Sequence, residues 1–191
     1  MSIPRLLAVS AALVTLAACD SQESLLGEFE AQLQTDDAVE AVEGEAVYSV
    51  VETAVGPRFV LGLFVGDLID SDRDDYDFIA FGRDGDVPSI GAYAVTEDPR
   101  GRQAVTATYA DVEDADDAVE AVGAIVRGTD GTLTITNVTR SGFVVGAFQF
   151  QGEGFRVEAP SVGLAASASG RFEARYVTPG RLQSLGVELG M

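Results

Sequence analysis

The chain has 191 residues, 47% of them apolar, and a net charge of −19, with 12 basic residues, one Cys, no His and no Trp. This length and apolar content predict one folded domain rather than a disordered chain. All the basic residues are arginine, and the acidic excess argues against nucleic acid as a partner, because phosphates bind Lys and Arg. Without His, a Ser-His-Asp triad is excluded and most zinc sites lose their usual ligands.

The first 19 residues have the order of a secretory signal. Arg5 supplies a positive charge, and Leu6–Ala18 is an uncharged run of 13 residues, too short to span a bilayer as a helix. The segment Leu16-Ala17-Ala18-Cys19 resembles the lipobox of bacterial lipoproteins. This resemblance implies cleavage after residue 18, lipidation of the Cys19 thiol, and a mature protein held at a membrane of the cell envelope. Either membrane, or the cell surface, is compatible with the sequence.

Residues 19–43 are expected to be the lipidated cysteine and an acidic tether. Their repeated Asp and Glu side chains favour a solvated, self-repelling segment. Leu25, Leu26, Phe29 and Leu33 fall at roughly helical spacing, so a short amphipathic helix and a disordered spacer are both open.

Residues 44–178 are expected to form the folded domain, followed by a tail over 179–191. Short β-branched and aromatic runs alternate there with Gly, Asp and Pro. The pattern predicts an all-β fold, an antiparallel β-sandwich or barrel of about nine to ten strands. The strands are expected near 45–53, 58–65, 76–83, 89–96, 103–109, 120–127, 131–138, 142–150, 161–168 and 170–177.

Local patterns support this assignment. In Thr132–Thr136 hydroxyl and aliphatic side chains alternate, which predicts one wet and one buried face. The same alternation directs Phe172, Ala174 and Tyr176 inward. Gly128-Thr129-Asp130-Gly131 is expected to be a hairpin turn, and Arg140-Ser141-Gly142 a second one.

Three further strand motifs resemble small β-rich bacterial lipoproteins. They are Gly-Thr-Leu-Thr-Ile-Thr at 131–136, Gly-Ala-Phe-Gln-Phe at 146–150 and Ser-Gly-Arg-Phe at 169–172. This resemblance covers about residues 120–177, and it implies a β fold and an envelope address without implying an activity.

Carboxylates are the main groups that could carry chemistry. Asp70, Asp72 and Asp74 alternate as calcium-loop ligands do, within an acidic cluster that runs from Asp67 to Asp77. The spacing departs from an EF-hand, so a looser Ca²⁺ site and a solvated acidic turn are both open. A second acidic cluster runs from Asp111 to Asp117.

We therefore expect a non-enzymatic, membrane-anchored envelope lipoprotein, a binding or structural module, with no catalytic residue and no cofactor beyond the possible Ca²⁺. Its expected partners are the membrane, through Cys19, and an envelope protein or hydrophobic ligand. The first alternative is a lipocalin-like carrier of a lipid or other hydrophobic molecule, because strand aromatics can line a cavity as well as fill a core. The second is a hydrolase that uses paired carboxylates.

Overall fold

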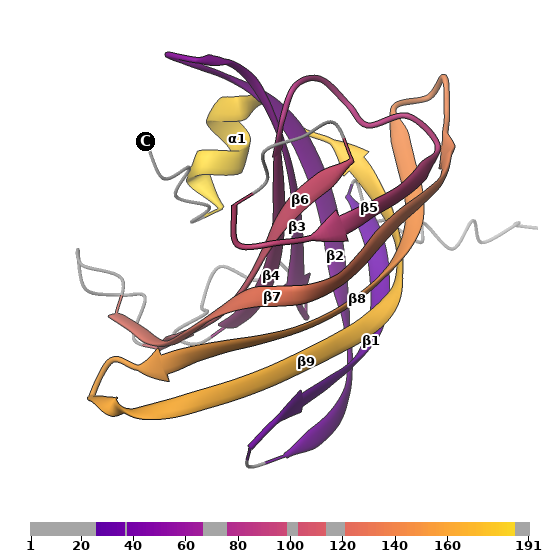
Figure 1. The fold of residues 1–191 in the computed structure, drawn as a ribbon. Coiled ribbons are helices and arrows are strands. Elements are labelled where there is room, and N and C mark those ends of the chain that lie inside the picture. Colours follow the sequence, from indigo (N-terminus) through magenta and orange to yellow (C-terminus); the bar gives the residue numbers. More distant parts are fainter. Residues whose placement is uncertain (1–25, 37, 67–75, 99–102, 114–120, 186–191) are drawn as a thin grey trace, which may run out of the picture.

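The computed structural model describes residues 26–36, 38–66, 76–98, 103–113 and 121–185. In this part of the chain, nine strands form a single sheet that closes into a barrel, with one short helix outside it (Figure 1). The elements are β1 (Gly27–Thr35), β2 (Val39–Thr53), β3 (Gly56–Val65), β4 (Tyr76–Asp84), β5 (Gly91–Val95), β6 (Ala104–Glu113), β7 (Ala121–Val138), β8 (Phe143–Arg156), β9 (Ala159–Tyr176) and α1 (Pro179–Ser184).

Neighbouring strands around the ring are mostly antiparallel, in the order β1-β2-β3-β4-β6-β5-β7-β8-β9, and β9 returns to β1. Strand β5 is short, so β6 also pairs directly with β7. Strand β1 starts at Gly27, between Ala46 of β2 and Glu173 of β9. Beyond that point β2 and β9 pair directly, and in parallel, at Val47–Arg175. The expected all-β barrel is thus confirmed, and the sheet closes as a ring.

The side chains predicted to point into or out of the barrel are largely confirmed. Leu133 and Ile135 are buried in the barrel, while Thr132, Thr134 and Thr136, which alternate with them, are not buried. Phe172 and Ala174 are also buried inside. The expectation for Tyr176 is wrong. It ends β9 with 47% of its surface exposed, and only its edge packs against Tyr48.

The predicted turn at Gly128–Gly131 is wrong, because β7 runs through it without a break. The register with β8 shifts between Gly128 and Asp130, which marks a β-bulge. A Cβ at residue 128 would lie 2.8 Å from Val95 and 2.9 Å from Ala107. The glycine there allows a close approach inside the barrel rather than a hairpin. The turn predicted at residues 140–142 is confirmed as the β7–β8 connection, where Gly142 has φ +87°.

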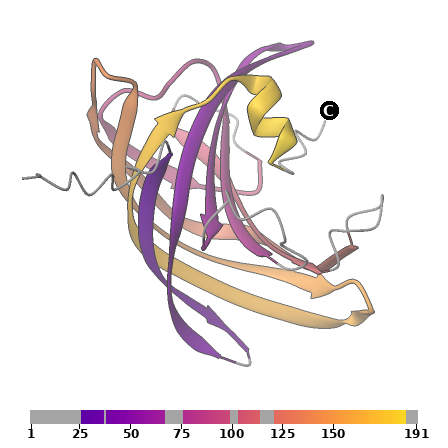
Figure 2. The ribbon, with the colours of Figure 1, turned by 180° about the vertical axis from the view of Figure 1, so that it is seen from behind.

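The two strands expected at 161–168 and 170–177 are one strand, β9. Gly170 lies between them, and a Cβ there would come within 2.3 Å of the Glu30 carbonyl oxygen on β1. This glycine permits the tight β1–β9 contact and does not end a strand. Strands β7, β8 and β9 therefore form the long wall of the barrel, visible in both ribbon views (Figures 1 and 2).

The tether expected over residues 19–43 is wrong for residues 27–43, which form β1 and the first part of β2. Phe29, Ala31 and Leu33 point into the core, while Glu28, Glu30 and Gln32 face outward. The residues after the barrel also have structure: α1 is capped by Thr178 and buries Leu182 against the outside of β2, beside Val47 and Val60. Among the described residues, no helix is long and apolar enough to cross a membrane.

The centre of the barrel is filled by aromatic side chains. Phe81 of β4 lies against Phe148 and Phe150 of β8, with ring centroids 5.4 Å and 5.9 Å apart. Strands β4 and β8 are not neighbours in the ring, so these contacts cross the interior. All three rings are at most 4% exposed. The barrel is therefore packed across its middle.

Candidate functional site

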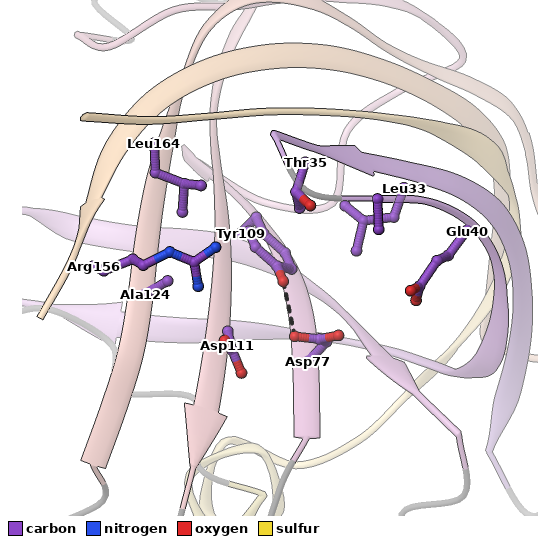
Figure 3. Close-up of a pocket in the computed structure, with 10 residues that line it drawn as sticks. Leu33, Thr35, Glu40, Asp77, Tyr109, Asp111, Ala124, Arg156 and Leu164 are labelled. Atoms are coloured by element: carbon purple, nitrogen blue, oxygen red, sulfur yellow. Dashed lines mark hydrogen bonds between the residues drawn. The ribbon is translucent and has the colours of Figure 1, made fainter. Parts of the chain in front are cut away.

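A polar pocket of about 240 Å³ lies at one end of the barrel (Figure 3). Several of its lining residues are at strand termini that meet there: the end of β1, the start of β2, the start of β4 and the end of β8. The pocket is lined by Leu33, Thr35, Ala38, Glu40, Asp77, Tyr109, Asp111, Ala124, Arg156 and Leu164.

Strand alternation brings the polar side chains into the barrel at this end. On β4, Asp77 follows the same inward face as Ile79 and Phe81, which belong to the central core. On β6, Tyr109 and Asp111 continue the inward face of Ala107. On β4 and β6 the apolar interior thus changes to an acidic one near the pocket end.

Asp77 and Tyr109 form the central contact of the pocket. The Tyr109 hydroxyl donates a hydrogen bond of 2.9 Å to Oδ1 of Asp77. Burial raises the pKa of Asp77, the Tyr109 hydrogen bond lowers it, and the negative charges of Asp111 and Glu40 raise it further, so that the net direction is upward. Burial, followed by the Asp77 charge, also raises the pKa of Tyr109, which keeps the phenol protonated as a donor.

Asp77 and Asp111 are direct cross-strand partners in the β4–β6 register. Residues opposite one another on a sheet face have Cβ atoms about 4.5–5.5 Å apart, and like charges placed this way destabilise the sheet. Here the pair lies at a half-enclosed barrel end, where water screens it less than on an open surface.

The remaining lining groups surround this pair with one positive charge and an apolar wall. The Arg156 guanidinium points into the pocket toward Tyr109 (Figure 3), and its charge lowers the pKa of that phenol. Leu33 and Leu164 are each 5% exposed and form the apolar wall. With Glu40, Asp77, Asp111 and Arg156 ionised, the lining has a formal charge of −2.

At the opposite end of the barrel, the described residues include a cation–π contact and a loop over the interior, and we call this the sealed end. The Arg83 guanidinium lies over the ring of Tyr93, 5.2 Å from its centroid. The Tyr93 hydroxyl donates to the carbonyl oxygen of Ser89 at 2.7 Å. In the same β4–β5 connection, Val87 packs against the core. This end of the interior is thus covered by one cation–π contact and a loop.

The site residues expected from the sequence lie outside the described residues: Cys19, Asp70, Asp72 and Asp74. Each acidic cluster nevertheless contributes one member to the pocket, Asp77 from the first and Asp111 from the second. Within the described ranges, no group of three His, Cys, Asp or Glu side chains is placed to hold a metal ion. The Ca²⁺ loop stays a prediction.

Sequence reasoning missed the pocket because its members are far apart in the chain. The separation of Asp77 from Asp111 is bridged only by the β4–β6 pairing. A signal was present, since Asp77 lies on the apolar face of the strand predicted at 76–83, before Ile79, and Asp111 continues the alternation of Tyr109 just beyond the strand predicted at 103–109.

Fold and site together define a closed β-barrel with an acidic pocket at one end, lined by Asp77, Tyr109 and Asp111. Comparisons with known protein families, with curated protein sequences and with solved structures found no match to this chain.

Proposed function

We propose that this protein is a non-enzymatic, lipid-anchored envelope protein that binds a small ligand in the pocket at the open end of its barrel. The observation that carries this proposal is the contrast between a filled interior and a polar end. Phe81, Phe148 and Phe150 occupy the centre, so a ligand meets the pocket and not a deep channel. The pocket combines a few convergent polar groups with apolar walls, as small-molecule sites do.

The proposed anchor precedes β1 in the sequence, and the pocket is lined by the last residues of this strand. Cys19 is eight residues before Gly27, a stretch that covers at most about 28 Å when fully extended. From Gly27 the nine residues of β1 lead to Thr35 at the pocket, about 27 Å away at the rise of an antiparallel strand.

The anchor is tested by metabolic labelling with a fatty-acid analogue in a bacterial host. Wild-type protein should be labelled and recovered with membranes, whereas Cys19→Ser should be unlabelled and released. Equal labelling of the two proteins would contradict the lipoprotein assignment.

The pocket is tested by native mass spectrometry of the full chain purified from its own host. The wild type should retain a small molecule, and Ala38→Trp, which fills the pocket from its rim, should lose it. Ala92→Trp is the matched control, because Ala92 is exposed on β5 and is not among the residues lining the pocket. Retention of the same molecule by Ala38→Trp would place the ligand elsewhere.

Two other functions each have one observation in their favour. Closure of the sheet into a barrel suits a lipocalin-like carrier, although the central aromatic packing leaves less room for a large apolar ligand. The Asp77–Asp111 pair supplies the two neighbouring carboxylates that a hydrolase needs. Hydrolysis of chromogenic glycosides by the wild type, lost in Asp111→Asn, would favour the hydrolase over the binding protein.

A further inference from the structure

We propose that the pocket binds small aliphatic amines, and that a short diamine, with an ammonium group at each end of an apolar chain, fits it best. This inference rests on the proposed function and specifies the ligand class of that same site. It follows from the mixed lining of the pocket, in which acidic, phenolic and aliphatic side chains face one enclosed space.

The acidic side chains in the pocket lie where their mutual repulsion destabilises the sheet. Asp77 and Asp111 are paired directly across β4 and β6, and Glu40 lines the same space from β2. Positions where a sequence breaks a local folding rule tend to be functional. The positive charge of a ligand beside Asp77 would lower the repulsion between these carboxylates.

The Asp77 carboxylate has an oxygen available for such a group. Its Oδ1 accepts the hydrogen bond of Tyr109, which fixes the orientation of the carboxylate. Its other oxygen points toward the side of the pocket where Glu40 lies (Figure 3). An ammonium group has three donors and would bridge Asp77 to a second acceptor in the lining.

A metal ion does not fit the same residues. The three carboxylates come from three strands, and no three acidic groups of the described chain are close enough together to hold one ion. A diamine carries its two positive charges at separate places, and the carboxylates are likewise at separate places around the pocket wall. Leu33 and Leu164 supply the apolar surface that such a chain would cover.

The charge and size of the pocket indicate which kind of amine fits it best. Arg156 offsets one of the three acids, which leaves a formal charge of −2 for the ligand to balance. A volume of about 240 Å³ is below the range of about 300–1,000 Å³ typical of drug-sized ligands. A short diamine meets both conditions, whereas a monoamine balances half of the charge.

The experiment is isothermal titration calorimetry of the full chain with four probes of equal length: the four-carbon α,ω-diamine, the monoamine, the diol and the dicarboxylate. We expect the diamine to bind most tightly, the monoamine more weakly, and the other two not at all. Asp77→Asn should weaken diamine binding by roughly tenfold or more, since a hydrogen bond to a charged group contributes about 1.5–3 kcal/mol. Glu40→Gln, at an exposed position that cannot endanger the fold, should weaken it less.

Asp86→Asn is the matched control, because it removes the same charge from an exposed position in the β4–β5 connection, at the sealed end. It should change the affinity less than about twofold. Equal effects of Asp77→Asn and Asp86→Asn would show that the diamine only screens the acidic surface, which overturns the proposal. Binding of the diol or dicarboxylate as tightly as the diamine, or no binding of either amine, also overturns it. In each of these cases the native mass-spectrometric test with Ala38→Trp still decides the proposed function separately.

Discussion

The two ends of the barrel interior differ in how their inward-pointing charged side chains are accommodated. At the sealed end, the one inward cation, Arg83, lies on the Tyr93 ring, and the β4–β5 connection covers both. At the pocket end, Asp77 and Asp111 face each other across adjacent strands, and the described residues leave a pocket there. In the first arrangement the cation lies against an aromatic ring. In the second, the proposed cationic ligand would lower the repulsion between the two carboxylates, and this difference is why we place the proposed site at the pocket end.

The aromatic centre separates the two ends, and removing it should have the largest effect. Phe81→Ala deletes a fully buried ring that contacts Phe148 and Phe150, and should lower the free energy of unfolding by about 3–5 kcal/mol. Urea denaturation of the full chain measures this loss. Phe155→Ala is the control at a 42% exposed ring. Similar small losses in both variants would show that the centre is not packed.

Substitutions at the sealed end should lower the stability of the protein by a moderate amount. Arg83→Gln removes the cation from the Tyr93 ring and should cost about 1–2 kcal/mol, as partly desolvated cation–π pairs do. Arg58→Gln breaks a pair with Asp84 at 4.0 Å, in which both side chains are well exposed, and should cost at most about 0.5 kcal/mol. Diamine binding should be unchanged in both variants. A loss of binding in Arg83→Gln would contradict the separation of the two ends.

The smallest effect is a pH dependence at the pocket end. Because the fold raises the pKa of Asp77 above its usual 3.8, the folded state holds this proton more tightly than the unfolded chain. The protonated Asp77 therefore contributes stability at a pH below its pKa in the unfolded chain. This contribution is lost as the pH rises through the pKa of Asp77 in the folded protein. Asn does not titrate and can still accept from Tyr109. Asp77→Asn should therefore gain stability relative to the wild type as the pH rises from 3 to 7.

Denaturation of both proteins across this pH range checks the prediction. The two proteins differ only at residue 77, so the difference between the two curves reports on Asp77 and on its interactions. A difference that stays constant with pH, or one that favours the wild type increasingly toward neutral pH, would contradict the account of the pocket.

The sequence predicts the class of the fold because strand alternation is local. Leu133 and Ile135 show this, as does the turn at residues 140–142. Glycine was the main source of error, since Gly128 and Gly170 resemble turn residues in sequence and serve as close contacts between strands. Residues 27–35 were misassigned because an acidic outer face resembles a tether when the buried partners of Phe29 and Leu33 are unknown.

The pocket could not be predicted in the same way. Its parts are joined by strand pairings such as Asp77 with Asp111, and by the meeting of β1, β2 and β8 at one end. These are properties of ring closure, and no window of the sequence contains them. What the sequence does contain is an acid at the inward position of two strands, which becomes informative once the strands are placed side by side.

The most direct test of the account is a two-dimensional NMR titration of the isotope-labelled full chain with the four-carbon diamine. The account predicts chemical-shift changes that saturate and that cluster at residues 33–40, 77, 109–111, 156 and 164, with none at Arg83 and Tyr93. Saturating changes centred on the sealed end, or changes spread evenly over the acidic surface, would contradict it.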